Sequence, residues 1–129
     1  MAARVFLALS ALLWLPYGVY CLAQPGFLDG AAGVAARTTT GTIELRAMYG
    51  GLQIAIGALC ALGAASAAWR AHALVALGFL TAGLGLARVT GAALGGELSA
   101  YTAMALGLEL GSAGLALLFM RGRTSAAVA

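Results

Sequence analysis

Glu109 is the residue whose type and position suggest chemistry most directly, because it is a single carboxylate inside a long apolar segment. Eleven uncharged residues precede it (98–108) and eleven follow it (110–120). At a helical rise of 1.5 Å per residue, Glu109 would lie about 16 Å from either end of this segment. If the segment crosses a bilayer, this carboxylate must be protonated, paired or hydrated. Two interpretations stay open: a proton, cation or ligand site, or a structural carboxylate paired inside the protein.

Arg88 is the basic residue that could pair with Glu109. It is the one charged residue between positions 73 and 92, and helical rise places it roughly 7 Å from the end of that segment. Thr81, Gly85 and Arg88 recur at helical i, i+4 and i+7 spacing, which gives the segment a polar stripe. The long arginine side chain could extend outward to lipid headgroups or inward to Glu109, and the sequence favours neither.

A second polar stripe begins in the stretch Glu44-Leu45-Arg46-Ala47-Met48-Tyr49-Gly50-Gly51-Leu52-Gln53. By helical rise Gln53 lies near the depth of Glu109, where a buried amide needs a partner. The members of this stripe lie on one helical face: Arg46, Tyr49, Gly50, Gln53 and Gly57. We predict a buried polar or ligand-binding cluster that faces one interior: Gln53, Thr81, Arg88 and Glu109. We place the remaining members at its outer mouth: Glu44, Arg46 and Tyr49.

Glycines mark the faces where helices could approach closely. Gly50 and Gly57 lie on the same predicted face as Gln53 and would admit a neighbouring helix. Gly107 and Gly111 form a second small-residue motif. Each of these glycines is two residues from Glu109, which corresponds to a rotation of about 200° around the helix axis. The motif therefore lies nearly opposite Glu109. It would meet a second neighbour, such as another copy of the chain.

The composition indicates what surrounds these groups. Of 129 residues, 63% are hydrophobic and 9% are charged, against about 25% charged in soluble domains. A hydrocarbon core about 30 Å thick needs about 20 apolar residues in a helix. Four segments are long enough, and we predict helices at about 5–23, 44–69, 73–92 and 98–120. The expected fold class is all-α, an integral membrane protein whose residues 1–129 form a single four-transmembrane-helix bundle.

The first segment has a second interpretation, because Arg4 before an apolar stretch is typical of a secretory signal peptide. Tyr20 is large where cleavage requires small residues, and three further spans follow. We therefore predict a retained helix, with Pro16 marking a kink or a packing position.

Charge predicts the orientation. With four spans, the basic residues fall on one side: Arg4, Arg70, His72, Arg121 and Arg123. The positive-inside rule makes that side cytoplasmic, so both termini would be inside. We expect a multi-pass protein of the bacterial inner (plasma) membrane.

Local signals predict the ends of the helices. A short turn at 67–71 would join the second and third spans. We predict Thr42 as the N-cap of the second span and Ser99 as the N-cap of the fourth. Gly95 and Gly96 would end the third.

Several function classes lack their usual sequence features. His72 is the one histidine, and Cys21 and Cys60 have no metal-ligand spacing, so we expect no metal and no cofactor. The sequence carries no phosphate-binding glycine loop and no supported nucleophile, so we do not expect an enzyme. No basic run indicates nucleic acid. The expected partners are the lipid bilayer and either further copies of the chain or another membrane protein.

The stretch from Thr42 to Gln53, with Gly57 after it, resembles the signature of a small bacterial membrane family catalogued as domain of unknown function 4345. Three further features fit that pattern: Arg88 with Gly91, then Glu109, and the stretch Gln-Pro-Gly-Phe at 24–27 after an apolar helix. The resemblance covers about residues 4–120. It implies four spans and brings no established activity.

Two functions remain in competition. The first is a binding or scaffold protein, in which the polar cluster engages a lipid headgroup, a small polar molecule or a partner membrane protein. The second is an oligomeric ion- or proton-coupled transporter or channel that uses Glu109. A single four-helix unit is small for alternating access, so we favour the first.

Overall fold

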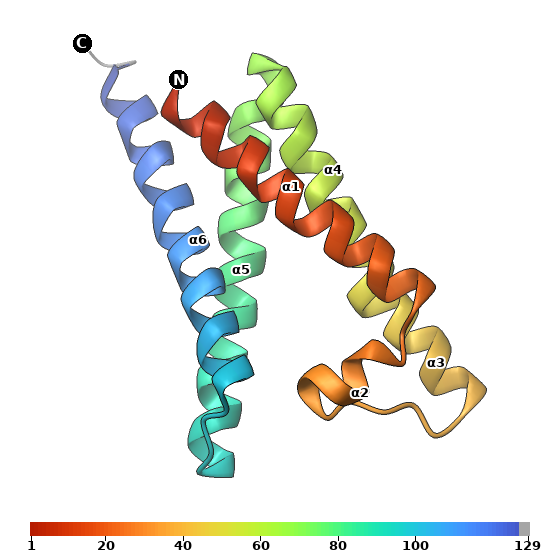
Figure 1. Ribbon diagram of the computed structural model, residues 1–129. Helices are drawn as coiled ribbons and strands as arrows, with labels where there is room; N and C mark the ends of the chain where they lie inside the picture. The colour runs from red at the N-terminus through yellow and green to blue at the C-terminus, as the bar shows by residue number, and fades with distance from the viewer. Residues whose placement is uncertain (127–129) are drawn as a thin grey trace.

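The computed structural model describes the backbone of residues 1–126 and the side chains of residues 1–121, and within this part only helices and their connections occur (Figure 1). The elements are α1 (Ala2–Ala23), α2 (Phe27–Ala32), α3 (Thr39–Leu45), the π-helical segment η1 (Arg46–Gly51), α4 (Leu52–Ala65), α5 (Ala67–Gly95) and α6 (Ala100–Ala126). Because α3, η1 and α4 are continuous, four helices are long and apolar enough to cross a membrane. The prediction of an all-α chain with four such helices is confirmed.

The turn between the second and third long helices is shorter than the sequence predicted. It lies at Ser66, where the backbone is extended (φ −119°, ψ 131°), and α5 begins at the next residue. The predicted turn at 67–71 is therefore helical. Its alanines favour helix over a loop, so one extended residue is enough to reverse the chain.

The caps agree with the sequence at one long helix and differ at another. Ser99 caps α6, because its Oγ accepts a hydrogen bond from the Thr102 amide at 3.1 Å. Thr42 as the cap of the second long helix is wrong. Thr38 takes that place and accepts from the Gly41 amide at 3.1 Å, since the helix begins about one turn earlier than predicted. Gly96, at φ 66°, ends α5 as expected.

Small residues bring α1 and α4 close together. A Cβ on Gly57 would lie 2.7 Å from the backbone nitrogen of Leu15, and one on Gly50 would lie 2.8 Å from the Cβ of Leu22. Since real Cβ atoms do not approach so closely, these two positions require glycine for the observed helix contact. The helices therefore form two closely packed pairs, α1 with η1–α4 and α5 with α6, joined through α4 and α5.

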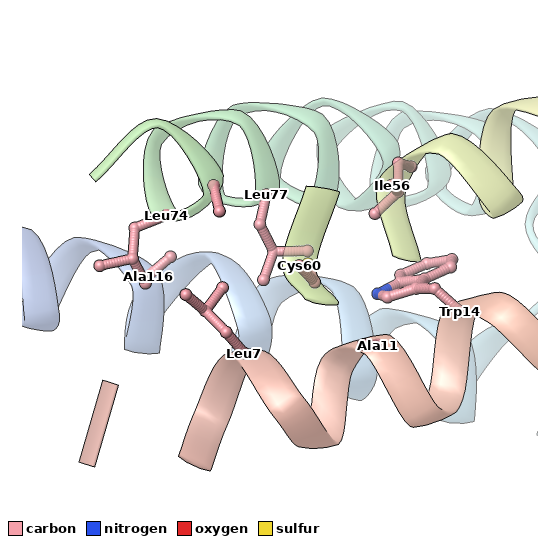
Figure 2. Close-up of a cluster of buried hydrophobic side chains, with 9 residues drawn as sticks. Leu7, Ala11, Trp14, Ile56, Cys60, Leu74, Leu77 and Ala116 are labelled. Carbon is pink, nitrogen blue, oxygen red and sulfur yellow. The ribbon is translucent and has the colours of Figure 1, made fainter. Parts of the chain in front are cut away.

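The apolar core fills one end of the molecule, which we call the closed end. This end holds the start of α1, the Ser66 turn and the end of α6 (Figure 1). Phe6 and Phe119 touch there, with ring centroids 5.5 Å apart. The core residues come from all four long helices: Leu7, Ala11, Trp14, Ile56, Cys60, Ala73, Leu74, Leu77 and Ala116 (Figure 2). Toward the other end, which we call the open end, α1 and α3–α4 diverge from α5–α6 (Figure 1).

Candidate functional site

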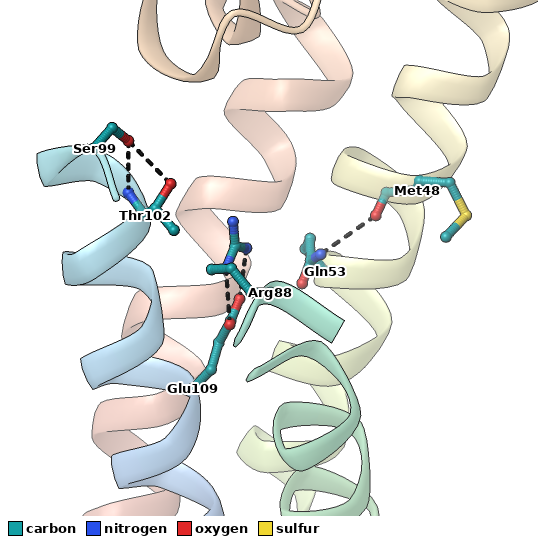
Figure 3. Close-up of polar contacts among 6 residues, drawn as sticks. All are labelled: Met48, Gln53, Arg88, Ser99, Thr102 and Glu109. Atoms are coloured by element: carbon teal, nitrogen blue, oxygen red, sulfur yellow. Dashed lines mark hydrogen bonds and ion pairs between the residues drawn. The ribbon is translucent and has the colours of Figure 1, made fainter. Parts of the chain in front are cut away.

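Arg88 of α5 and Glu109 of α6 form an ion pair in the region where the helix pairs diverge (Figure 3). Arg88 Nε donates to Glu109 Oε2 at 3.0 Å, and Nη2 donates to Oε1 at 2.7 Å. The side chains are 27% and 5% exposed respectively. Two parallel charge-assisted hydrogen bonds are the strong form of this interaction. Of the two directions that the sequence left open for Arg88, the structure has the inward one.

Tyr101 holds Arg88 from a second side. The guanidinium carbon of Arg88 lies 5.8 Å from the centroid of the Tyr101 ring, within the range of a cation–π contact. Both partners of Arg88 therefore belong to α6. Gly85, one turn before Arg88, lets α6 approach α5, because a Cβ there would lie 2.9 Å from Leu110 Cγ.

Gln53 stands just after the π-helical segment, and its amide group serves the backbone there. The Leu52 amide donates to the Ala47 carbonyl five residues back, and α-helical spacing resumes at Leu52. A change from five-residue to four-residue spacing skips one carbonyl, that of Met48. Gln53 Nε2 donates to this carbonyl at 3.3 Å. The side chain thus supplies the hydrogen bond that the π segment omits.

The other end of the Gln53 amide is unsatisfied. Gln53 is 6% exposed, and its Oε1 is buried without a hydrogen-bond partner in the described part of the chain. Figure 3 shows this oxygen turned away from Met48, on the side of Arg88 and Glu109. The indole Nε1 of Trp14, on α1, is likewise buried and unpartnered within the described residues. Buried polar atoms are normally paired, so these two need a reason.

Both residues line a cavity of about 510 Å³, which we call the Arg88 cavity, between α1–α4 and α5–α6. Arg88 and Glu109 supply its charged groups. Most of its wall is apolar: Leu13, Leu52, Leu84, Met104 and Leu108. An apolar pocket with a few converging polar groups, at this volume, has the character of a small-molecule site.

The Arg88 cavity opens sideways between α1 and α6. Within the described part of the chain, these two helices are not among the pairs in substantial contact. Four apolar side chains of the wall are also exposed on the surface: Leu13 of α1 at 42%, Met104 and Leu108 of α6 at 69% and 42%, and Met48 of η1 at 53%. The lateral rim is therefore apolar, while the polar groups lie deeper.

A second cavity of about 750 Å³, the α2 cavity, lies toward the open end beside the 31–34 segment. Tyr49, Arg88 and Tyr101 line both cavities. These three side chains therefore stand at the boundary between the laterally open cavity and the open end of the molecule.

Four of the predicted site residues, Tyr49, Gln53, Arg88 and Glu109, line the Arg88 cavity. Thr81 does not. It is fully buried, and its hydroxyl donates to the Leu77 carbonyl at 2.7 Å, so its own helix satisfies it.

Glu44 and Arg46 also lie outside both cavities. Both are exposed, and Arg46 Nε donates to the Leu22 carbonyl at 3.1 Å, near the end of α1. The physical reason is the π segment. A π turn holds more residues than an α turn, so Arg46 at its start and Glu44 before it leave the face that α-helical spacing assigns to Gln53.

The predicted packing glycines divide into two groups. Gly50 and Gly57 contact α1, whereas a Cβ on Gly107 or Gly111 would meet no atom of the described residues within 4 Å. The second motif therefore lies on the surface of the molecule, away from the other helices.

The sequence interpretation missed the aromatic contribution of α1 and α6. Trp14, Tyr17 and Tyr101 all line the Arg88 cavity. Trp14 and Tyr17 stand at i, i+3 spacing and so share a helical face, which was the available signal. No local pattern related that face to Arg88 and Glu109.

The fold and this site define a class: a small all-helical protein with four potential membrane-spanning helices and an ion-paired cavity between two helix pairs. Residues 2–120 match a family model described as Domain of unknown function (DUF4345). The match covers nearly the whole chain, and the chain belongs to this family. No curated protein and no solved structure matches it.

Proposed function

We propose that this chain is a multi-pass protein of the bacterial inner membrane, with both termini in the cytoplasm, that binds a small amphiphilic molecule in the Arg88 cavity. Its apolar exterior supports insertion, since Leu12, Phe79 and Leu118 are 72%, 77% and 62% exposed. Arg4 and Arg70 lie at the closed end, and the positive-inside rule assigns such an end to the cytoplasm. The Arg88 cavity would then belong to the outer half of the membrane.

The observation that carries the binding proposal is the combination of an apolar cavity of about 510 Å³ with a polar inner end and a lateral apolar opening. Arg88, Glu109 and Gln53 form the polar part. Such a shape suits a molecule that arrives from the bilayer with its apolar part and places its polar head inside.

The alternative, a proton or cation carrier that uses Glu109, has less support. The Glu109 carboxylate already accepts two hydrogen bonds from Arg88. A transported proton or cation would have to displace the guanidinium at each passage, which leaves a buried charge unpaired.

Binding can be tested by mass spectrometry of the gently purified protein with one cavity-filling variant. Ala105 lines the Arg88 cavity, whereas Ala103 of the same helix is exposed and does not. We expect the wild type and Ala103→Trp to retain a small molecule and Ala105→Trp to lose it. Ala105→Leu gives a smaller filling in case tryptophan prevents folding. A wild type without any retained molecule, or a filled cavity that retains as much, would contradict the proposal.

The orientation can be tested by cysteine labelling in cells, in a Cys21→Ala, Cys60→Ala background. We expect an impermeant maleimide to label Gly30→Cys in intact cells and Ala68→Cys only after permeabilisation. Both positions are exposed, and they lie at opposite ends of the molecule. The reverse labelling pattern would invert the assigned sides.

A further inference from the structure

The polar atoms of the Arg88 cavity restrict the chemistry of the molecule that it binds. We propose that the cavity takes an uncharged amphiphile whose polar head carries a hydroxyl group, with that hydroxyl hydrogen bonded to Gln53 Oε1. This inference rests on the function proposed above and names the class of ligand.

The first argument is charge. Arg88 and Glu109 are the charged residues of the lining, and their bidentate contact at 3.0 and 2.7 Å makes the pair neutral. A charged head would find no counter-ion in the cavity unless it broke this pair and left its other member buried and unpaired. The site therefore favours a head without charge.

The second argument is the orientation of the Gln53 amide. Its Nε2 faces the Met48 carbonyl at 3.3 Å, so the opposite assignment would place two acceptors against each other. The orientation is thus fixed, and the oxygen is left facing the cavity side. This oxygen is buried in a residue that is 6% exposed, and it has no partner in the described part of the chain. It can be satisfied only by a donor from a bound molecule or water.

The third argument compares the head groups that could satisfy this oxygen. Trp14 Nε1 can only donate, and it is also buried and unpartnered among the described residues. Figure 2 shows this nitrogen on the side of Cys60, toward the apolar core, so Gln53 Oε1 is the free polar atom of the described residues on the cavity side. A hydroxyl both donates and accepts, whereas an ether or ester head only accepts.

The apolar part of the ligand follows from the rest of the lining. Leu13, Met104 and Leu108 line the cavity and are exposed at its lateral opening. A hydrocarbon tail would lie between α1 and α6 and continue toward the surrounding lipid. A long-chain alcohol and a monoacylglycerol share this chemistry, and the two are separate arms of the test.

The test uses the full chain in phosphatidylcholine nanodiscs, with empty nanodiscs as background. Tritiated 1-hexadecanol is the labelled probe. Its competitors have the same chain length: the unlabelled alcohol, its methyl ether, palmitate at mildly alkaline pH, and monopalmitoylglycerol. We expect the alcohol to bind about fivefold or more tightly than the ether and palmitate, as the gain of one hydrogen bond predicts. Comparison with monopalmitoylglycerol then tells which hydroxyl lipid fits better.

The variant Gln53→Leu should reduce the affinity for the alcohol about fivefold to tenfold and leave that for the ether unchanged. Gln24→Leu is the matched control, since Gln24 is exposed at the end of α1. If Gln53→Leu does not fold, Gln53→Met keeps the length of the side chain, also removes the amide oxygen, and should weaken alcohol binding in the same direction.

The outcomes separate this inference from the function on which it rests. Equal affinities of alcohol and ether, or tightest binding of palmitate, would overturn the hydroxyl assignment and leave a binding protein. Absence of saturable alcohol binding would overturn it as well. If the purified wild type also retains no small molecule, the proposed function fails with it.

Discussion

Breaking the Arg88–Glu109 pair should destabilise the protein in a way that depends on which partner remains. Glu109→Gln keeps the shape of the side chain and removes its charge, which leaves Arg88 without a counter-ion. Loss of one partner of a fully buried pair costs about 3–5 kcal/mol. Because the Arg88 side chain is 27% exposed, we reduce this to about 2–3 kcal/mol for either single variant, Glu109→Gln or Arg88→Gln.

The double variant Arg88→Gln, Glu109→Gln should be less harmful than the two single changes together. It leaves no unpaired charge, and two facing amides can still form a hydrogen bond. We expect a loss of about 2 kcal/mol in the double variant, so the coupling energy of the pair is about 2 kcal/mol or more.

The cycle can be measured by SDS-induced unfolding in mixed micelles, followed by tryptophan fluorescence. Exposed residues of the same types provide matched controls: Glu97→Gln and Arg37→Gln. Neither forms an ion pair within the described residues, and each should change the free energy of unfolding by less than about 0.5 kcal/mol. Additive single changes, within about 0.5 kcal/mol, would refute the bidentate pair as a stabilising contact.

Two further predictions concern helix contacts and caps. Gly57→Ala should lower the free energy of unfolding by about 1–3 kcal/mol, because its Cβ would lie 2.7 Å from the Leu15 nitrogen. Gly111→Ala is the control, because a Cβ there would meet no described atom within 4 Å, and it should be neutral or slightly stabilising in the same titration. If Gly57→Ala and Gly111→Ala lowered the free energy of unfolding equally, the close contact of Gly57 with Leu15 would be disproved. Ser99→Ala should cost about 1 kcal/mol by removing the bond from the Thr102 amide. Faster amide exchange confined to the first turn of α6 would show it, and unchanged exchange would argue against the cap.

The sequence alone predicted the four long apolar helices and the polar residues that lie within them. Four long apolar helices follow from local composition, because a segment with almost no charge cannot face water wherever its neighbours lie. The same reasoning selected Gln53, Arg88 and Glu109, since few ionisable or amide groups occur within these segments and each needs a partner. The family could be recognised from its local signature, and the match to residues 2–120 confirms it.

Only the tertiary structure decided how these residues meet. The π-helical segment moved Arg46 away from the face of Gln53, and Thr81 found its partner in the backbone of its own helix. The Arg88 cavity exists because α1 packs on α4 and α6 on α5, while α1 and α6 diverge. Periodicity gives the direction of a side chain relative to its own helix axis. Which helix stands opposite, and whether a gap remains between them, depends on the packing of residues far apart in the chain, such as Gly57 against Leu15.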